Sequence, residues 1–165
     1  MTGTLAFECY ADEDVARFLG EHCHLPLRRL HRYGQGQVVD AVLIRGVAAI
    51  GLVDEDPGKP HHGQRDRTTV VSETVDLIHR RKGDRHLFVV RPDLEECFLA
   101  CTRRLGIVPR DLPQDARELR TLLGLHRHRT HEAFRRELAS LHRESRSRAI
   151  ATFVTDLETG LRAVL

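Results

Sequence analysis

The chain has 165 residues, which is enough for one domain of ordinary size with a substantial hydrophobic core. Its formal net charge of +2 is small, and charges of both signs are mixed along the chain, so composition alone does not indicate a nucleic-acid-binding protein. Because no apolar run approaches the length of a membrane span and we find no signal-peptide pattern before Phe7, we expect a soluble, cytoplasmic protein without a membrane partner.

The cysteines and histidines show no metal-binding spacing. Cys9, Cys23, Cys97 and Cys101 form no CxxC pair, which predicts reduced, packing cysteines rather than a disulfide framework or a zinc site. The histidines at 61, 62, 126, 128 and 131 lie in polar, Arg-rich surroundings, where solvated loop histidines are the simpler expectation.

The N-terminal part predicts a strand followed by a helix. Leu5–Phe7 is a short apolar segment, and residues 12–23 carry apolar side chains at helical spacing after an acidic first turn. Glu8 would therefore lie at the end of the first strand. Residues 25–33 show no clear preference, whereas residues 37–44 favour an amphipathic helix, with a strand as the open alternative.

The most informative stretch is an apolar run, residues 46–53, that ends abruptly in Asp54-Glu55-Asp56. Such a run is typical of a buried parallel strand, and parallel strands present ligand-binding groups at their carboxyl ends. Asp54 and Asp56 can face the same side and share a hard divalent cation, with Glu55 pointing away. A solvated turn is the alternative, because Asp, Pro and Gly are ordinary turn residues.

The next segments predict a loop over residues 57–71, a helix over residues 72–81 that ends at Lys82-Gly83, and a buried strand over residues 87–90. Pro92 then suits the start of a further helix.

That helix carries Glu95. Three acidic positions, Glu8, the Asp54/Asp56 pair and Glu95, thus follow apolar strands, and they converge on one edge of the sheet if the strands are parallel.

The C-terminal part changes character. Helices are predicted over residues 115–123, 130–142 and 147–165, so we divide the chain into an α/β core, 1–105, and a helical extension, 106–165, packed on it. Nearly all basic residues are Arg. The guanidinium group is well suited to bind phosphate, but codon bias in a GC-rich genome explains the excess of Arg equally well. The Arg-rich run 127–148 is either a solvated helical face or a phosphate-facing patch.

The acidic positions resemble motifs of the TOPRIM domain, the metal-binding domain of topoisomerases, bacterial-type primases, recombination-repair proteins and small nucleases. Glu8 and Asp12 stand at the Glu and Asp of the first motif, and Asp54 and Asp56 stand at the DxD motif. The resemblance covers about residues 4–105.

A second stretch, residues 91–99, resembles a Pro-x-Leu-Glu segment of free-standing TOPRIM-like proteins of phage-defence operons, which places Glu95 at the recurring carboxylate. Two positions depart from the family pattern. Cys9 stands where the family usually has Gly, and Gly58 follows the DxD motif one residue sooner than in topoisomerases and primases, which argues against those two classes.

The resemblance implies a Rossmann-like core with a mostly parallel sheet flanked by helices, and a Mg²⁺- or Mn²⁺-dependent nuclease that cleaves DNA or RNA, possibly within a phage-defence system that includes a separate ATPase or sensor. Metal ions held by carboxylates stabilise the charge that develops during phosphodiester cleavage. The expected metal ligands are Asp54 and Asp56, with Asp12 as a supporting ligand. Glu8 is expected to act in acid/base catalysis or to bind a second metal ion, and Glu95 to support catalysis. Arg91 and Lys59 are the expected phosphate-binding residues.

Other readings stay open. Asp12 could instead cap the first helix, and Glu95 could simply favour a helix N-terminus. The protein could also be a non-catalytic TOPRIM-like interaction module whose helical tail docks a partner ATPase or sensor. A phosphoacceptor of the receiver type is the least favoured, because it needs a lysine at the end of a later strand and neither Lys59 nor Lys82 is predicted to stand there.

Overall fold

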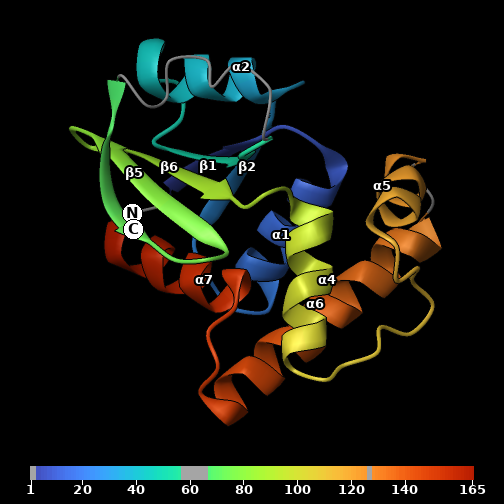
Figure 1. The fold of residues 1–165 in the computed structure, drawn as a ribbon. Helices are drawn as coiled ribbons and strands as arrows, with labels where there is room; N and C mark the ends of the chain where they lie inside the picture. The colour runs from blue at the N-terminus through green and yellow to red at the C-terminus, as the bar shows by residue number, and fades with distance from the viewer. Residues whose placement is uncertain (1–2, 57–66, 126–127) are drawn as a thin grey trace.

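A six-stranded sheet forms the middle layer of the protein in a computed structural model, which describes residues 3–56, 67–125 and 128–165 (Figure 1). The strand order is β2-β1-β3-β6-β5-β4; the first four strands run parallel, and β5 and β4 continue the sheet antiparallel. The strands are β1 (Gly3–Phe7), β2 (Leu27–His31), β3 (Ile50–Asp54), β4 (Thr69–Glu73), β5 (Leu77–Lys82) and β6 (Arg85–Val90). The expected α/β fold with a mostly parallel sheet is confirmed.

One face of the sheet is covered by α2 (Gln35–Val39) and by η1 (Asp40–Ile44), a π-helical segment that continues it (Figure 1). These two segments confirm the helical expectation for residues 37–44. Gly51 allows α2 and η1 to pack closely against β3, because a Cβ atom at position 51 would lie 3.0 Å from Val38 and 3.1 Å from Val42.

The other face is covered by the remaining helices. They bury one large core in which the phenylalanines of strands and helices meet; the rings of Phe98 and Phe134, for example, lie 5.1 Å apart in an edge-to-face arrangement. Because Phe134 belongs to the C-terminal part of the chain, that part shares the core of the sheet. The helices are α1 (Tyr10–Glu21), α4 (Leu94–Arg104), α5 (Ala116–Gly124), α6 (His128–Arg148) and α7 (Phe153–Val164).

The strand connections leave β1 and β3 in opposite directions along the sheet, so a topological switch point lies between these two strands. From β1 the chain crosses through α1 to β2 on one side, whereas β6, β5 and β4 lie on the other side, beyond β3. In open α/β sheets ligands bind at such a point, outside the carboxyl ends of the strands.

The predicted helix over residues 72–81 is wrong. This segment contributes to β4 and β5 instead, and Lys82 pairs with Arg85 across a two-residue connection, Gly83-Asp84. Gly83 has a φ of 60°, so the Lys82-Gly83 pair marks a hairpin turn and not the end of a helix. The β-branched residues of the segment favour strands, and pairing with β6 decides the outcome.

Several boundaries also move. The central strand begins at Ile50 rather than at residue 46, and it includes Asp54. The unassigned segment 25–33 contains β2. The helix predicted over 130–142 runs to Arg148, and the last helix begins only at Phe153, after Ala149 adopts a left-handed φ of 54°.

Candidate metal centre

The carboxyl ends of β1 and β3 open into a pocket of about 260 Å³ at the switch point. Four of the predicted acidic residues line it, so the structure brings together carboxylates that lie far apart in the sequence. The lining residues are Glu8, Cys9, Tyr10, Ala11, Asp54, Asp56, Glu95, Arg120, Leu123 and Gly124.

Glu8 and Asp54 are linked directly across the two strands. The backbone N–H of Asp54 donates a hydrogen bond of 2.9 Å to Oε1 of Glu8. The side chain of Gln35 donates to the carbonyl oxygen of the same residue, Asp54. These bonds fix the end of β3 and hold Glu8 at the mouth of the pocket.

Asp12 lies fully buried in the first turn of α1. Its Oδ2 accepts hydrogen bonds from the backbone N–H groups of Cys9, at 3.1 Å, and Glu8, at 3.3 Å, so the helix-capping alternative is confirmed for this oxygen. Its Oδ1 is different: it is buried and has no hydrogen-bond partner among the described residues, and the same is true of Oδ1 of Asp54.

These buried carboxyl groups hold protons strongly. The pKa of Asp12 is raised to about 8, mainly by burial and secondly by the charge of Glu8. Burial, and next the charges of Asp12 and Glu8, raise the pKa of Asp54 well above its usual value. A cation bound here would replace the protons and satisfy the two partnerless oxygens, because carboxylate oxygens are the ligands that hard divalent ions prefer.

The side chains of Asp56 and Glu55 have different surroundings, as expected. Asp56 lines the pocket, and its backbone N–H donates to the carbonyl oxygen of Pro92 at 3.0 Å. The carboxylate of Glu55 instead accepts from Nε of Arg91 at 3.1 Å.

Arg91 is not brought to the pocket. Its guanidinium pairs with Glu55 and, at 2.6 Å, with Glu73 of β4. Although partial burial disfavours its charged form, these carboxylates raise the pKa of Arg91. The structure therefore gives Arg91 a pairing role that competes with the predicted phosphate binding. Lys59, the other predicted phosphate ligand, lies outside the described residues.

Among the described residues, Arg120 of α5 is the cation that lines the pocket, and the sequence did not indicate it. It pairs with Asp93 at 2.7 Å and with the buried Glu95 at 3.4 Å. Burial raises the pKa of Glu95, and Arg120 lowers it in part. No spacing relates Arg120 to Glu95; only the packing of α5 against α4 does. Asp93, rather than Pro92, caps α4 by accepting from the N–H of Glu96.

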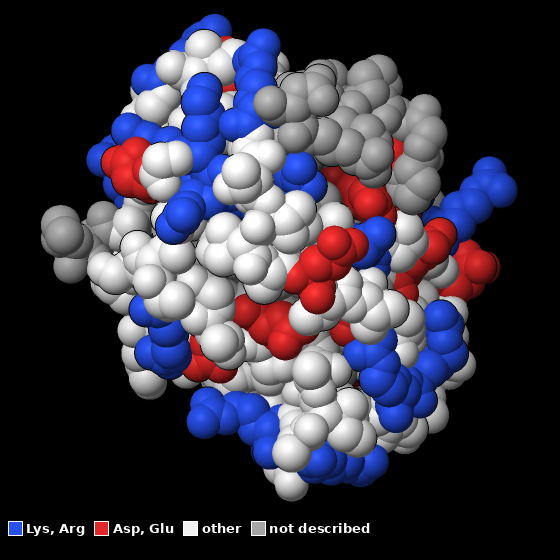
Figure 2. All heavy atoms as spheres, turned by 60° about the vertical axis from the view of Figure 1, so that its left-hand side comes forward, with Lys and Arg blue, Asp and Glu red and all other residues white. Residues whose placement is uncertain are grey.

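Among the described residues, basic and acidic side chains are mixed on the face of the molecule shown in Figure 2. Lys and Arg side chains form separate groups there, with acidic residues between them. Within the Arg-rich run, Arg135 pairs with Asp14 and Arg148 pairs with Glu144. The expectation of a solvated histidine is wrong for His131, because α6 packs it against Asp14 of α1. His61, His62 and His126 lie outside the described residues.

Among the described residues, two groups bring three potential metal-ligand atoms within 4.8 Å of one another: Asp76, Cys97 and Cys101, and Cys23, His142 and Glu158. Neither includes a carboxylate of the acidic pocket, where the carboxylates lie farther apart. The four cysteines are free, as expected, and three of them are buried.

Comparisons of the chain with protein-family models, with curated proteins and with solved structures found no match. None of the helices in the described part of the chain is both long enough and apolar enough to cross a membrane. The function must therefore be inferred from the geometry of the acidic pocket.

Proposed function

We propose that the protein is a Mg²⁺-dependent nuclease with a TOPRIM-like core. The observation that carries this proposal is the acidic pocket at the switch point, where Glu8, Asp54 and Asp56 converge and where Asp12 and Asp54 each bury a partnerless carboxylate oxygen. A cluster of this charge is costly to bury without a counter-ion.

The donor set fits Mg²⁺. Asp54 and Asp56, together with Oδ1 of Asp12, would hold the ion, and Mg²⁺ commonly uses a few carboxylates and keeps several water ligands. When bound, Mg²⁺ supplies charge stabilisation to the phosphate oxygens of a phosphodiester. Mn²⁺ would be accepted by the same oxygen ligands.

The chain's own residues then divide the remaining work. Glu8, fixed by the N–H of Asp54, is the group we assign to accept a proton from the attacking water. Arg120 presents a guanidinium in the pocket wall, so it replaces Arg91 as the expected phosphate contact. Asp12 keeps α1 capped, so that the backbone following β1 stays in place.

The test is hydrolysis of single- and double-stranded DNA and RNA by the purified protein with Mg²⁺ or Mn²⁺. We expect Asp54→Asn and Glu8→Gln to lower the rate at least about 100-fold. Glu55→Gln is the matched control, because Glu55 adjoins Asp54 but pairs outside the pocket, and it should keep most of the activity. Activity without a divalent ion, or activity that survives Asp54→Asn, contradicts the proposal.

A second candidate is a non-catalytic interaction module that uses the same fold to dock a partner ATPase or sensor, for instance in a phage-defence system. It is favoured by α5, whose Arg120, Leu123 and Gly124 wall the pocket and whose Arg120 already neutralises Glu95. Metal binding without hydrolysis of any nucleic acid, together with stable co-purification of the product of a neighbouring gene, would select this candidate.

A further inference from the structure

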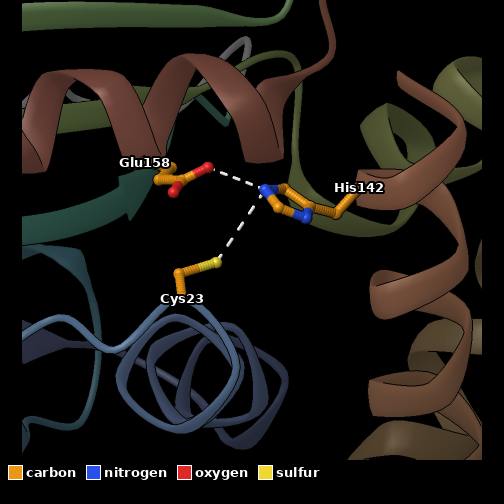
Figure 3. Close-up of side chains that lie close together, drawn as sticks. All are labelled: Cys23, His142 and Glu158. Carbon is orange, nitrogen blue, oxygen red and sulfur yellow. Dashed lines mark hydrogen bonds and ion pairs between the residues drawn. The ribbon is translucent and has the colours of Figure 1, made fainter. Parts of the chain in front are cut away.

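Three chemically reactive side chains meet in the core between three helices. Cys23 follows α1, His142 belongs to α6 and Glu158 belongs to α7, and Figure 3 shows all three pointing toward one another. Each is at most 7% exposed. Sequence patterns could not reveal this group, because its members lie more than a hundred residues apart or on separate helices.

Both contacts of the group use the same nitrogen of His142. Its Nε2 lies 2.7 Å from Oε2 of Glu158 and 3.9 Å from Sγ of Cys23 (Figure 3). A Cys-His-acid catalytic triad uses the two ring nitrogens separately, one for the nucleophile and one for the acid. The arrangement therefore differs from a triad: a sulfur, a nitrogen and an oxygen all face one another.

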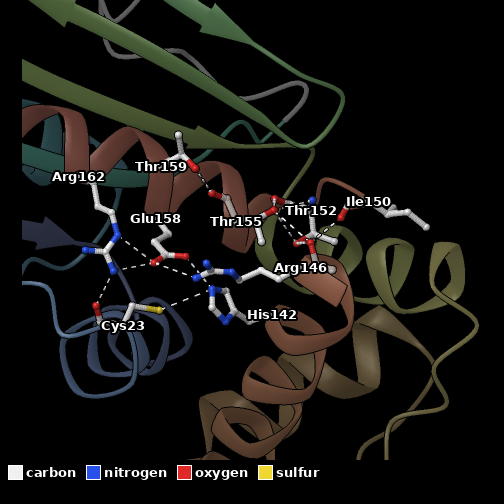
Figure 4. A network of polar contacts seen from close by, with 10 residues as sticks. Cys23, His142, Arg146, Ile150, Thr152, Thr155, Glu158, Thr159 and Arg162 are labelled. Carbon is white, nitrogen blue, oxygen red and sulfur yellow. Dashed lines mark hydrogen bonds and ion pairs between the residues drawn. The ribbon is translucent and has the colours of Figure 1, made fainter. Parts of the chain in front are cut away.

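The two oxygens of Glu158 have different partners. Oε1 accepts from Arg162 at 2.8 Å and lies 3.9 Å from Arg146, whereas Oε2 faces His142 (Figure 4). Arg162 also donates to the carbonyl oxygen of Cys23 at 2.8 Å. The arginines thus orient Glu158 and the Cys23 backbone from outside the group, as outer residues do around metal ligands.

We propose that Sγ of Cys23, Nε2 of His142 and Oε2 of Glu158 form a zinc site. Zn²⁺ takes sulfur, nitrogen and oxygen ligands at about 2.0–2.3 Å, so neighbouring ligand atoms in a tetrahedral site lie about 3.3–3.8 Å apart. All three atoms lie within 4.8 Å of one another, so only small side-chain movements are required. On binding, the Cys23 thiol loses its proton to solvent, and the thiolate and carboxylate together balance the two charges of the ion.

The other sulfur-containing group is a poorer site. Both oxygens of Asp76 are already bound by Arg104, each at 2.7 Å, and so neither is available without breaking a bidentate ion pair. This group supplies a matched control that contains buried thiols of the same kind.

The zinc site is independent of the acidic pocket. Tyr10 and Ala11, which begin α1, line the pocket, whereas Cys23 lies beyond the other end of this 12-residue helix, about 18 Å away along its axis. The site would join the end of α1 to α6 and α7, with water in the fourth tetrahedral position.

The test uses the purified full chain, stripped of metal by a chelator and then titrated with Zn²⁺ or Co²⁺. We expect one equivalent of Co²⁺ to give visible bands of tetrahedral geometry and a near-ultraviolet thiolate-to-cobalt band. Cys23→Ser and Glu158→Gln should remove the thiolate band or weaken Zn²⁺ binding at least about 100-fold. Cys97→Ser and His24→Asn, a conservative change at an exposed neighbour, should leave both unchanged.

A wild-type protein without a thiolate-to-cobalt band, or a band lost in Cys97→Ser and kept in Cys23→Ser, would overturn the zinc site. If a variant does not fold, as judged by circular dichroism, X-ray absorption of the zinc-loaded wild-type protein decides instead. One sulfur ligand among nitrogen and oxygen ligands supports the site, whereas none or several sulfurs contradict it.

Discussion

Replacing Asp12 by Asn should flatten the pH dependence of stability when divalent ions are absent. Burial and the charge of Glu8 raise the pKa of Asp12 from 3.8 to about 8. Between these values the folded protein keeps a proton that the unfolded chain has released, so the free energy of unfolding falls as the pH rises. For one retained proton the slope is about 1.4 kcal/mol per pH unit.

Between the two pKa values, 3.8 and about 8, the free energy of unfolding falls by roughly 6 kcal/mol in total. This is a large part of the total stability of an ordinary domain, about 5–15 kcal/mol. Asn does not ionise, and its side-chain oxygen can still accept the hydrogen bond from the Cys9 N–H that caps α1. The variant should therefore gain stability relative to wild type as the pH rises.

The assay is urea unfolding followed by circular dichroism, with a chelator present, at several values between about pH 5 and pH 8. Glu96→Gln, an exposed change in the first turn of α4, is the control and should follow the wild-type slope. Equal slopes for wild type and Asp12→Asn would refute the reasoning, since the buried carboxyl group would then not carry the retained proton.

Two further changes test the packing of the helices. Gly160→Ala would place a Cβ atom 2.5 Å from the ring of Phe88, so thermal unfolding should show a loss of about 1–3 kcal/mol. The control is Gly124→Ala, whose new Cβ would have no atom of the described residues within 4 Å, so this change should be neutral or stabilising. Arg104→Ala should lower the free energy of unfolding in urea by about 3 kcal/mol, because it leaves the buried carboxylate of Asp76 without its ion-pair partner. Adding Asp76→Asn should recover part of that loss, and no recovery would show that the ion pair is not the cause.

The parallel strands were predictable because their sequence signal is local. Leu87–Val90 lies in β6 as expected, and Asp54 ends β3 where the apolar run stops. Since the ends of parallel strands share one sheet edge, the convergence of Glu8 with Asp54 followed from these two assignments.

The partners of the basic residues were not predictable in the same way. Arg91 was expected to face phosphate, but its partner Glu73 lies in β4, within a hairpin that the sequence suggested to be helical. Arg120 reaches Glu95 only because α5 packs beside α4. Such contacts depend on tertiary packing, which periodicity within one segment does not encode.

The strand pairings also set an order for assembly. β5 and β6 are joined by two residues, so this hairpin can close quickly, whereas pairing of Leu5 with Ile50 must close a long loop and needs the crossing helix in place. The acidic pocket is lined by residues that lie far apart in the chain, from Glu8 after β1 to Arg120 in α5. The hairpin therefore needs only residues 77–90, whereas the wall of the acidic pocket is complete only after the chain has been synthesised through α5.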